Sequence, residues 1–438
     1  MTEPSHASDF PAPVVARHVT LALMVAYVFS YVDRQILSML VGPIRADLGL
    51  SDTEVSLLHG LAFAICYTVL GVWPIGRWAD TGNRRNIVAG GIFLWSLMTA
   101  LCGRATSYLG LFAARVGVGV GEAALTPTAY SMIADLYPPR QRSRALALFS
   151  VGIYFGIGAA VMITGALVSM ISAAEVMHWP LIGEVRPWQL PFLILGPLGM
   201  LVTIWMLRIP EPARQTAVPA ATHFVDVMRW MRQEWPFYVL HTFGVSMLTL
   251  VFNGVAFWIP AHFMRVHGFS PIEVAFSYGP IMLVAGAAGI MVGGTLADRW
   301  RAAGKQDAEL RVLLMSALLL APLVALTFST AKPYLALALL VPTLFCSSFP
   351  FAAASAALQL VTPGPLRARA SALYLLVINL TGIGIGATAM SMVSDYVLQD
   401  EQRIGDGVIT VTAVAAPLAA LLIGRALRPY RELAARGR

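Results

Sequence analysis

Long apolar segments dominate the chain and are separated by short stretches that contain charged residues. Each segment holds about twenty residues or more, the length that an α-helix needs to cross a bilayer. The apolar runs are continuous and do not alternate with polar positions, which favours helices over a membrane β-barrel. The pattern predicts twelve membrane-spanning helices, over residues 18–44, 54–78, 86–104, 108–134, 142–170, 187–208, 236–262, 272–297, 311–329, 333–360, 368–394 and 405–427.

The composition supports a membrane environment. Apolar residues make up 58% of the chain and charged residues only 12%, which is about half the charged share of a typical soluble protein. A soluble globule needs a polar surface that this composition cannot supply. The three cysteines lie in separate apolar runs and show neither zinc-binding nor disulfide spacing. We therefore expect an all-α integral membrane protein with no metal or other cofactor and no nucleic-acid partner.

Basic residues are distributed unevenly between the two sets of loops. With both termini on one side, that side carries 22 of the 30 basic residues, the opposite side carries six, and two lie inside spans. Loops on the cytoplasmic side of membrane proteins are enriched in Lys and Arg. The distribution predicts cytoplasmic termini in a bacterial-type inner (plasma) membrane, and we expect the single chain to be the functional unit.

The chain contains an internal repeat. Residues 76–80, Gly-Arg-Trp-Ala-Asp, recur 218 residues later as Gly-Thr-Leu-Ala-Asp at 294–298. The pattern Pro-x3-Arg-x-Arg-Ala that begins at Pro138 recurs 225 residues later, at Pro363. Two matches in the same order indicate a six-helix unit that has been duplicated. Such repeats are typical of transporters, whose substrate site lies between the repeats near the membrane midplane.

The repeat divides the chain into an N-terminal six-helix bundle over residues 1–208 and a C-terminal bundle over residues 236–438. Residues 209–235 form the linker. Its apolar residues recur at helical spacing, which predicts a short amphipathic helix at the membrane interface, although an ordinary polar linker stays possible. These apolar residues are Phe224, Val227, Met228, Met231 and Trp235.

Three motifs resemble those of the major facilitator superfamily of secondary transporters. The loop that runs from Gly76 to Arg85 is similar to the superfamily pattern G-x-x-x-D-R-x-G-R-R/K, except that Thr81 replaces the first arginine. Arg115 and the glycines after it resemble the motif of the fourth helix, and residues 210–214 resemble the motif that ends the sixth. The resemblance implies two six-helix bundles that expose a central site to each side of the membrane in turn.

The resemblance also implies a gate formed by the motif loops. Asp80 is expected to pair with basic residues and with the start of the eleventh helix, because a carboxylate is favoured at a helix N-terminus. Gly76 would let the helices approach closely, and Asp298 would pair with Arg142 or Arg144 in the repeated loop. The alternative is that these charges serve only to orient the chain. The predicted gating residues are Gly76, Asp80, Arg84, Arg85, Asp298, Arg142 and Arg144.

A narrower resemblance is to the Spinster family of lysolipid and sphingolipid transporters. It rests on Tyr31-Val-Asp33-Arg34 in the first helix, Gly119-Val-Gly121-Glu122 in the fourth, and Asn83-Arg84 in the motif loop. Members of that family carry sphingosine phosphate or lysophospholipids. The resemblance therefore implies a lipid-like anionic solute and transport driven by a proton gradient.

Four ionisable residues lie well inside predicted spans, namely Asp33, Arg34, Arg115 and Glu122. Each costs roughly 2.5–3.5 kcal/mol at the centre of a membrane helix, so such residues persist only where they face each other or water. At about 1.5 Å of rise per residue, Asp33 and Arg115 reach similar depths. We therefore expect Asp33 to pair with Arg115, or with its neighbour Arg34, in some states.

These four residues suggest a mechanism. We expect Asp33 and Glu122 to carry protons, because burial raises a carboxyl pKa and a nearby arginine lowers it. Arg34 and Arg115 remain charged and can hold an anionic head group through paired hydrogen bonds. A permanent ion-pair cluster that only joins the first and fourth helices is the structural alternative.

The second half offers aromatic and amide side chains instead of buried charge, which suits the apolar tail of an amphiphile. The predicted cavity residues are Tyr31, Asn253, Trp258, Tyr374 and Asn379, although simple helix packing explains each of them equally well. The sequence thus predicts a proton-coupled transporter of an amphiphilic, anionic solute. The alternative is a proton-coupled exporter of drugs or organic anions. An intramembrane enzyme would need a nucleophile with a neighbouring base, or clustered metal ligands, and the sequence shows neither. A channel would not require the internal repeat.

Overall fold

The computed structural model describes residues 10–70, 75, 78, 81–171, 177–179, 183–214 and 224–436. Its helices follow the predicted segments closely, because continuous apolar runs in hydrocarbon must satisfy their backbone groups internally. In the first half the elements are α1 (Pro13–Leu48), α2 (Asp52–His59), α3 (Leu61–Leu70), α5 (Arg84–Cys102), α6 (Tyr108–Glu122), α7 (Leu125–Leu136), α8 (Pro139–Ile171), β1 (Met177–Trp179), β2 (Gly183–Val185), η2 (Pro187–Gln189) and α9 (Leu190–Arg208).

The second half begins with a short helix in the linker and continues with the C-terminal bundle. Its elements are α10 (Phe224–Gln233), α11 (Trp235–Val266), α12 (Pro271–Ile281), η3 (Met282–Gly286), α13 (Ala287–Ala302), α14 (Ala308–Ser329), α15 (Pro333–Ser348), α16 (Phe351–Val361), η4 (Gly364–Leu366), α17 (Arg367–Met392), η5 (Val393–Leu398), η6 (Glu401–Arg403) and α18 (Ile404–Arg436).

Eleven helical segments in the described part of the chain are long and apolar enough to cross a membrane. The second predicted span corresponds to α2 and α3, which Gly60 separates, and its residues 71–74, 76 and 77 lie outside the described ranges. The all-α membrane architecture with a twelve-helix count is thus consistent with the structure. Turns break the second span at Gly60, the fourth at residues 123–124 and the tenth at residues 349–350. A short hairpin formed by β1 and β2 precedes the sixth span.

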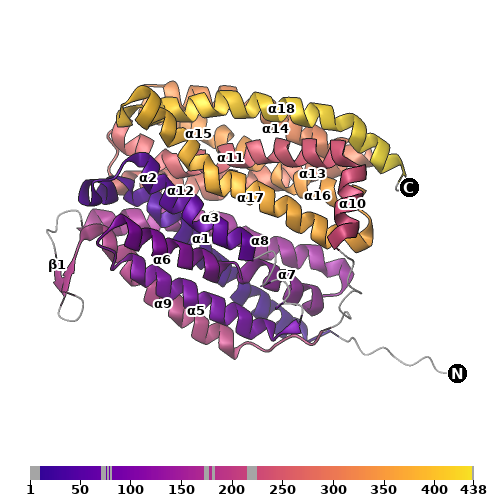
Figure 1. Cartoon of the computed structure of the whole chain (residues 1–438), viewed down its shortest axis with the longest axis horizontal. Coiled ribbons are helices and arrows are strands. Elements are labelled where there is room, and N and C mark those ends of the chain that lie inside the picture. The colour runs from indigo at the N-terminus through magenta and orange to yellow at the C-terminus, as the bar shows by residue number, and fades with distance from the viewer. Residues whose placement is uncertain are drawn as a thin grey trace.

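The helices form two bundles that lie side by side along their length (Figure 1). In the first bundle α1 packs on α8 and α5 on α9, and in the second α11 packs on α17 and α18. The bundles meet where α8 contacts α12 and where α2 and α3 contact α17. The β1–β2 hairpin and α2 lie at one end of the molecule, the hairpin end, and α10 and the last turns of α18 lie at the other, the terminus end (Figure 1).

Close helix crossings depend on glycine, and Gly121 and Gly158 are two examples. A Cβ atom on Gly121 would lie 2.6 Å from the backbone nitrogen of Trp95 in α5. A Cβ atom on Gly158 would lie 3.0 Å from the backbone oxygen of Gly279, at the contact between the two bundles. The glycines therefore allow backbones to approach within and between the bundles, as small residues do in membrane helices.

Candidate functional site: a buried charge cluster

The structure brings the four intramembrane charges together into one cluster. Asp33 and Arg34 lie on α1, and Arg115 and Glu122 lie two turns apart on α6. All four are buried, with exposed fractions of 4%, 6%, 0% and 0% in chain order. Adjacent positions on α1 point in different directions, so each pairs with a different residue on α6.

The first pair of the cluster joins Arg34 to Glu122. Arg34 Nε donates to Glu122 Oε2 over 2.6 Å. The hydroxyl of Ser30, one turn earlier on α1, donates to the same carboxylate oxygen over 2.5 Å. The other oxygen of Glu122 has no hydrogen-bond partner among the described residues. The carboxylate is therefore held through one of its two oxygens only.

Aromatic rings enclose the guanidinium group of Arg34. Its central carbon lies 4.7 Å from the ring centroid of Tyr31, 4.5 Å from that of Phe63 and 4.5 Å from that of Tyr67. A cation over the faces of aromatic rings is stabilised by their quadrupoles, and more strongly when water is excluded. The rings therefore support a charge that the low-dielectric interior would otherwise disfavour.

The second pair joins Asp33 to Arg115 more loosely. Arg115 Nη1 lies 3.5 Å from Asp33 Oδ1 and donates to the backbone oxygen of Asp33 over 3.3 Å. Thr99 in α5 donates its hydroxyl to Asp33 Oδ2 over 2.5 Å. Arg115 Nε donates to the carbonyl of Leu58 over 3.5 Å, whereas its Nη2 has no partner within the described ranges. Arg115 thus retains a free donor inside the bundle.

The structure therefore places Asp33 beside Arg115, one of the two partners expected for it. Glu122 pairs with Arg34 instead of with Arg115, although Arg115 shares its helix face. A small pocket of about 10 Å³ lies beside Asp33 between α1, α5 and α9, which is space for about one water molecule. The pocket is lined by Phe29, Asp33, Trp95, Ser96, Thr99, Leu195 and Gly199.

Sequence reasoning missed the neutral side chains that complete the cluster. Ser30 precedes Arg34 by one helical turn, and this spacing could have identified it. Phe63, Tyr67 and Thr99 come from other helices, and nothing in their own segments distinguishes them from packing residues. Within the described part of the chain, no group of three His, Cys, Asp or Glu residues could hold a metal ion.

The predicted cavity residues fall into two groups. Trp258 is fully buried and donates its indole NH to the backbone oxygen of Ala387 over 2.8 Å, and Tyr374 is buried against the ring of His241. These two side chains fill the second bundle and face no open space in this conformation. The half-buried group consists of Tyr31, Asn253 and Asn379.

The predicted gate is described only in part, because Gly76 and Asp80 lie outside the described residues. Arg84 is fully buried, pairs with Asp135, and donates from Nε to Glu211 over 2.9 Å. The backbone NH of Arg85 donates to the same Glu211 over 2.8 Å. Both arginines therefore tie the loop before α5 to the motif after α9, inside the first half.

The repeated loop shows a different arrangement. Asp298 is exposed, and among the described residues no ion pair joins it to Arg142 or Arg144. Arg142 instead donates from Nε to the backbone oxygen of Tyr137 over 2.9 Å. The expected contact between Asp298 and these arginines is thus not formed in this conformation.

Comparison with known proteins agrees with this architecture. The Major Facilitator Superfamily model matches residues 23–387. The chain is 29% identical over 410 residues to an MFS-type efflux pump of Mycolicibacterium smegmatis, across 92% of this chain and 90% of the pump. It is 30% identical over 307 residues to protein spinster homolog 1 of Xenopus tropicalis, across 65% of this chain but only 55% of that protein.

A solved structure gives the same result. The structure superimposes with a TM-score of 0.81 on the crystal structure of a bacterial homologue of the human lysosomal transporter Spinster, in an inward-facing and unoccupied conformation. Sequence identity to that chain is 25%, and the match covers 98% of this chain and 99% of the other. This chain therefore belongs to the major facilitator superfamily of membrane transporters, and within it resembles the Spinster proteins.

Proposed function

We propose that this transporter moves an amphiphilic, anionic, lipid-like solute of the lysophospholipid or sphingolipid class by alternating access, driven by a proton gradient. The observation that carries the proposal is the pair of buried carboxylate–arginine contacts between α1 and α6. Buried charges of this kind cost several kcal/mol in a membrane and mark ion or substrate pathways.

Proton binding is assigned to Asp33 and Glu122. The carboxylate of Asp33 accepts from Thr99 over 2.5 Å, but its charged partner Arg115 lies 3.5 Å away, and it borders a small pocket. That of Glu122 has one oxygen without a partner among the described residues. The distance between each carboxylate and its arginine can change between conformations, which alters the balance between desolvation and charge pairing. The carboxylate then binds or releases a proton.

Head-group recognition is assigned to the arginines. Arg115 has a free donor, Nη2, in a buried position, and a planar guanidinium suits phosphate and carboxylate groups. The apolar tail would lie against the second bundle, whose deep residues are aromatic and aliphatic. The similarity to protein spinster homolog 1 and to the bacterial Spinster homologue supports a solute of this class.

The topology belongs to the same proposal. The hairpin end is assigned to the external side and the terminus end to the cytoplasm of a bacterial-type inner membrane, because 22 of the 30 basic residues lie in loops on the side of the termini. One chain contains all four charges of the cluster, which supports a monomer as the functional unit.

Export of a drug or an organic anion is the second candidate, because the chain aligns with an MFS-type efflux pump over nearly its whole length. Purified protein in liposomes with an imposed pH gradient separates the two. We expect a labelled lysophospholipid to accumulate and a cationic dye to remain at the level of empty liposomes. Gradient-driven movement of the dye without movement of the lysophospholipid would favour the second candidate and contradict the first.

A further inference from the structure

The short helix α2 is separate from the rest of its span. It begins at Asp52 and ends at His59, and at Gly60 the backbone leaves the helical conformation, with φ −88° and ψ −81°. Eight residues at about 1.5 Å each make a rod of about 12 Å. One end of this rod lies at the hairpin end of the molecule and the other at the charge cluster.

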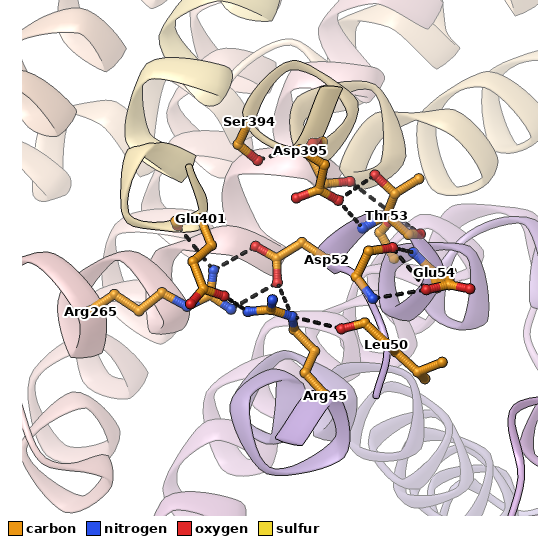
Figure 2. A network of polar contacts seen from close by, with 12 residues as sticks. Arg45, Leu50, Asp52, Thr53, Glu54, Arg265, Ser394, Asp395 and Glu401 are labelled. Carbon is orange, nitrogen blue, oxygen red and sulfur yellow. Dashed lines mark hydrogen bonds and ion pairs between the residues drawn. The ribbon is translucent and has the colours of Figure 1, made fainter. Parts of the chain in front are cut away.

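At its outer end α2 is clamped by both bundles. The Asp52 carboxylate, fully buried, accepts from two nitrogens of Arg265 in α11 over 2.5 and 2.8 Å. On its other side lies Arg45 Nε of α1, 3.2 Å away. Figure 2 shows the carboxylate between these two arginines, one from each half. Arg45 of the first half also pairs with Glu401 of the second half, which gives a second ion pair between the two halves.

A second carboxylate holds the same end of α2. Both the backbone NH and the hydroxyl of Thr53 donate to Asp395 Oδ2, each over 2.7 Å (Figure 2). Asp395 lies in η5, a π-helical segment at the end of α17. Carboxylates are favoured near a helix N-terminus because its NH groups carry partial positive charge. We call Arg45, Asp52, Arg265, Asp395 and Glu401 the outer lock.

At its inner end α2 is bonded to the charge cluster. Arg115 Nε donates to the carbonyl of Leu58, one of the last carbonyls of the helix, over 3.5 Å. His59 Nδ1 lies 3.1 Å from the carbonyl of Arg34, and it must be the donor because a carbonyl only accepts. The ring of His59 packs on Phe257 of α11, with 4.3 Å between ring centroids.

We propose that α2 is the coupling element between the charge cluster and the outer lock, with Asp52 as the locking carboxylate and His59 as a positioning residue. The inference rests on the proposed function. When Arg34 or Arg115 changes partner on protonation, the contacts of Leu58 and His59 change with it. A rigid helix transmits that shift to Asp52, whose paired contacts with Arg265 require close geometry. The contacts of the outer lock then break or form as the charge cluster binds or releases protons.

The test measures the separation of the two halves at the hairpin end. Leu109 at the start of α6 and Tyr334 at the start of α15 are 75% and 80% exposed, which suits them for spin labels. Cysteines are placed there after the three native cysteines have been replaced. Pulsed electron paramagnetic resonance on protein in lipid nanodiscs then gives the distance distribution without substrate or a pH gradient.

We expect Asp52→Asn to raise the ratio of open to closed populations about tenfold, within the range typical of coupling between sites. Asp47→Asn is the matched control, because it breaks an ion pair with Arg186 at the same end but within one half. An unchanged distance in Asp52→Asn, or a shift of equal size in the control, would overturn the lock.

His59 tests the coupling itself. His59→Leu removes the bond to the Arg34 carbonyl and leaves every lock residue in place. It should therefore raise the ratio of open to closed populations about fivefold. His59→Asn retains a donor and should reverse most of that shift. No shift in His59→Leu would overturn the coupling role. The label distances are measured without any transport, so they test this inference separately from the proposed function. If the variants shift the populations as expected but the protein moves no protons, the proposed function is refuted and this inference stands.

Discussion

Replacing Glu122 by glutamine is the sharpest perturbation of the charge cluster. Glutamine keeps the shape of the side chain and an oxygen that can accept from Ser30 and Arg34, which contact Glu122 over 2.5 and 2.6 Å. It cannot take up a proton. Leaving the charge of a buried ion-pair partner without compensation costs about 3–5 kcal/mol, and the retained oxygen offsets part of that cost. We therefore expect a folded protein that has lost one of its two proposed proton sites and, with it, the coupling to the gradient.

The consequence for transport follows from the energy of the gradient. One proton that moves down a gradient of one pH unit supplies about 1.4 kcal/mol, which supports a tenfold accumulation of solute. In liposomes with such a gradient, wild-type protein should concentrate labelled lysophospholipid up to about tenfold per coupled proton. The glutamine variant should equilibrate the solute at about onefold, with or without the gradient.

A matched control separates this effect from general damage. Glu309 is also buried and paired with an arginine, Arg301, but it lies in the second half, away from the cluster. Glu309→Gln should keep the dependence on the gradient. If Glu122→Gln still concentrated the lysophospholipid about tenfold under the gradient, Glu122 would not carry the coupled proton and the assignment would fail.

Three further predictions address the surrounding structure. In Gly60→Ala the new Cβ atom would lie 2.7 Å from the backbone oxygens of Ile383 and Gly384, so the distance between labels at 109 and 334 should lengthen; an unchanged distance would count against close packing of α2 on α17. Arg84→Ala leaves the carboxylates of Asp135 and Glu211 without their shared partner and should lower the unfolding free energy by about 3–5 kcal/mol, with an unchanged thermal midpoint as the opposing result. Burial raises the pKa of Asp307, which lies between α13 and α14, but its bonds and charge contacts with Arg311 and Arg431 outweigh burial and leave the pKa below its usual value. Asp307→Asn should therefore destabilise the protein by up to about 1 kcal/mol at pH 7, because both arginines are half exposed. The difference should fade as the pH falls below about 4 and through the lowered pKa of the wild-type carboxylate; a difference that persists in acid would argue against charge as its source.

The membrane architecture could be predicted from the sequence because each determinant is local. A continuous apolar run must form a helix in hydrocarbon, and an ionisable residue inside such a run must find a partner. That reasoning identified Asp33, Arg34, Arg115 and Glu122, which the structure brings together. The sequence could not show that Glu122 pairs with Arg34, because the choice of partner depends on how α1 and α6 are rotated about their axes.

The outer lock was not predicted for a related reason. Asp52, Arg265 and Glu401 lie at the ends of spans, where charged residues are ordinary and usually reflect only topology. Nothing in the segments around 52 and 265 indicates that these residues meet, since they are 213 positions apart and belong to different halves. Contacts of this kind depend on the packing of the two bundles, and a break such as that at Gly60 depends on the helix that it faces.

Proton movement that accompanies the solute is the most direct test of the central claim. Protein is reconstituted into liposomes that contain a pH-sensitive dye, and a lysophospholipid is added without a pre-formed gradient. The buried cluster predicts a change in internal pH with wild-type protein and none with the Asp33→Asn, Glu122→Gln double variant. Solute transport by wild-type protein without any change in pH, or an equal change with the double variant, would contradict the role of the cluster.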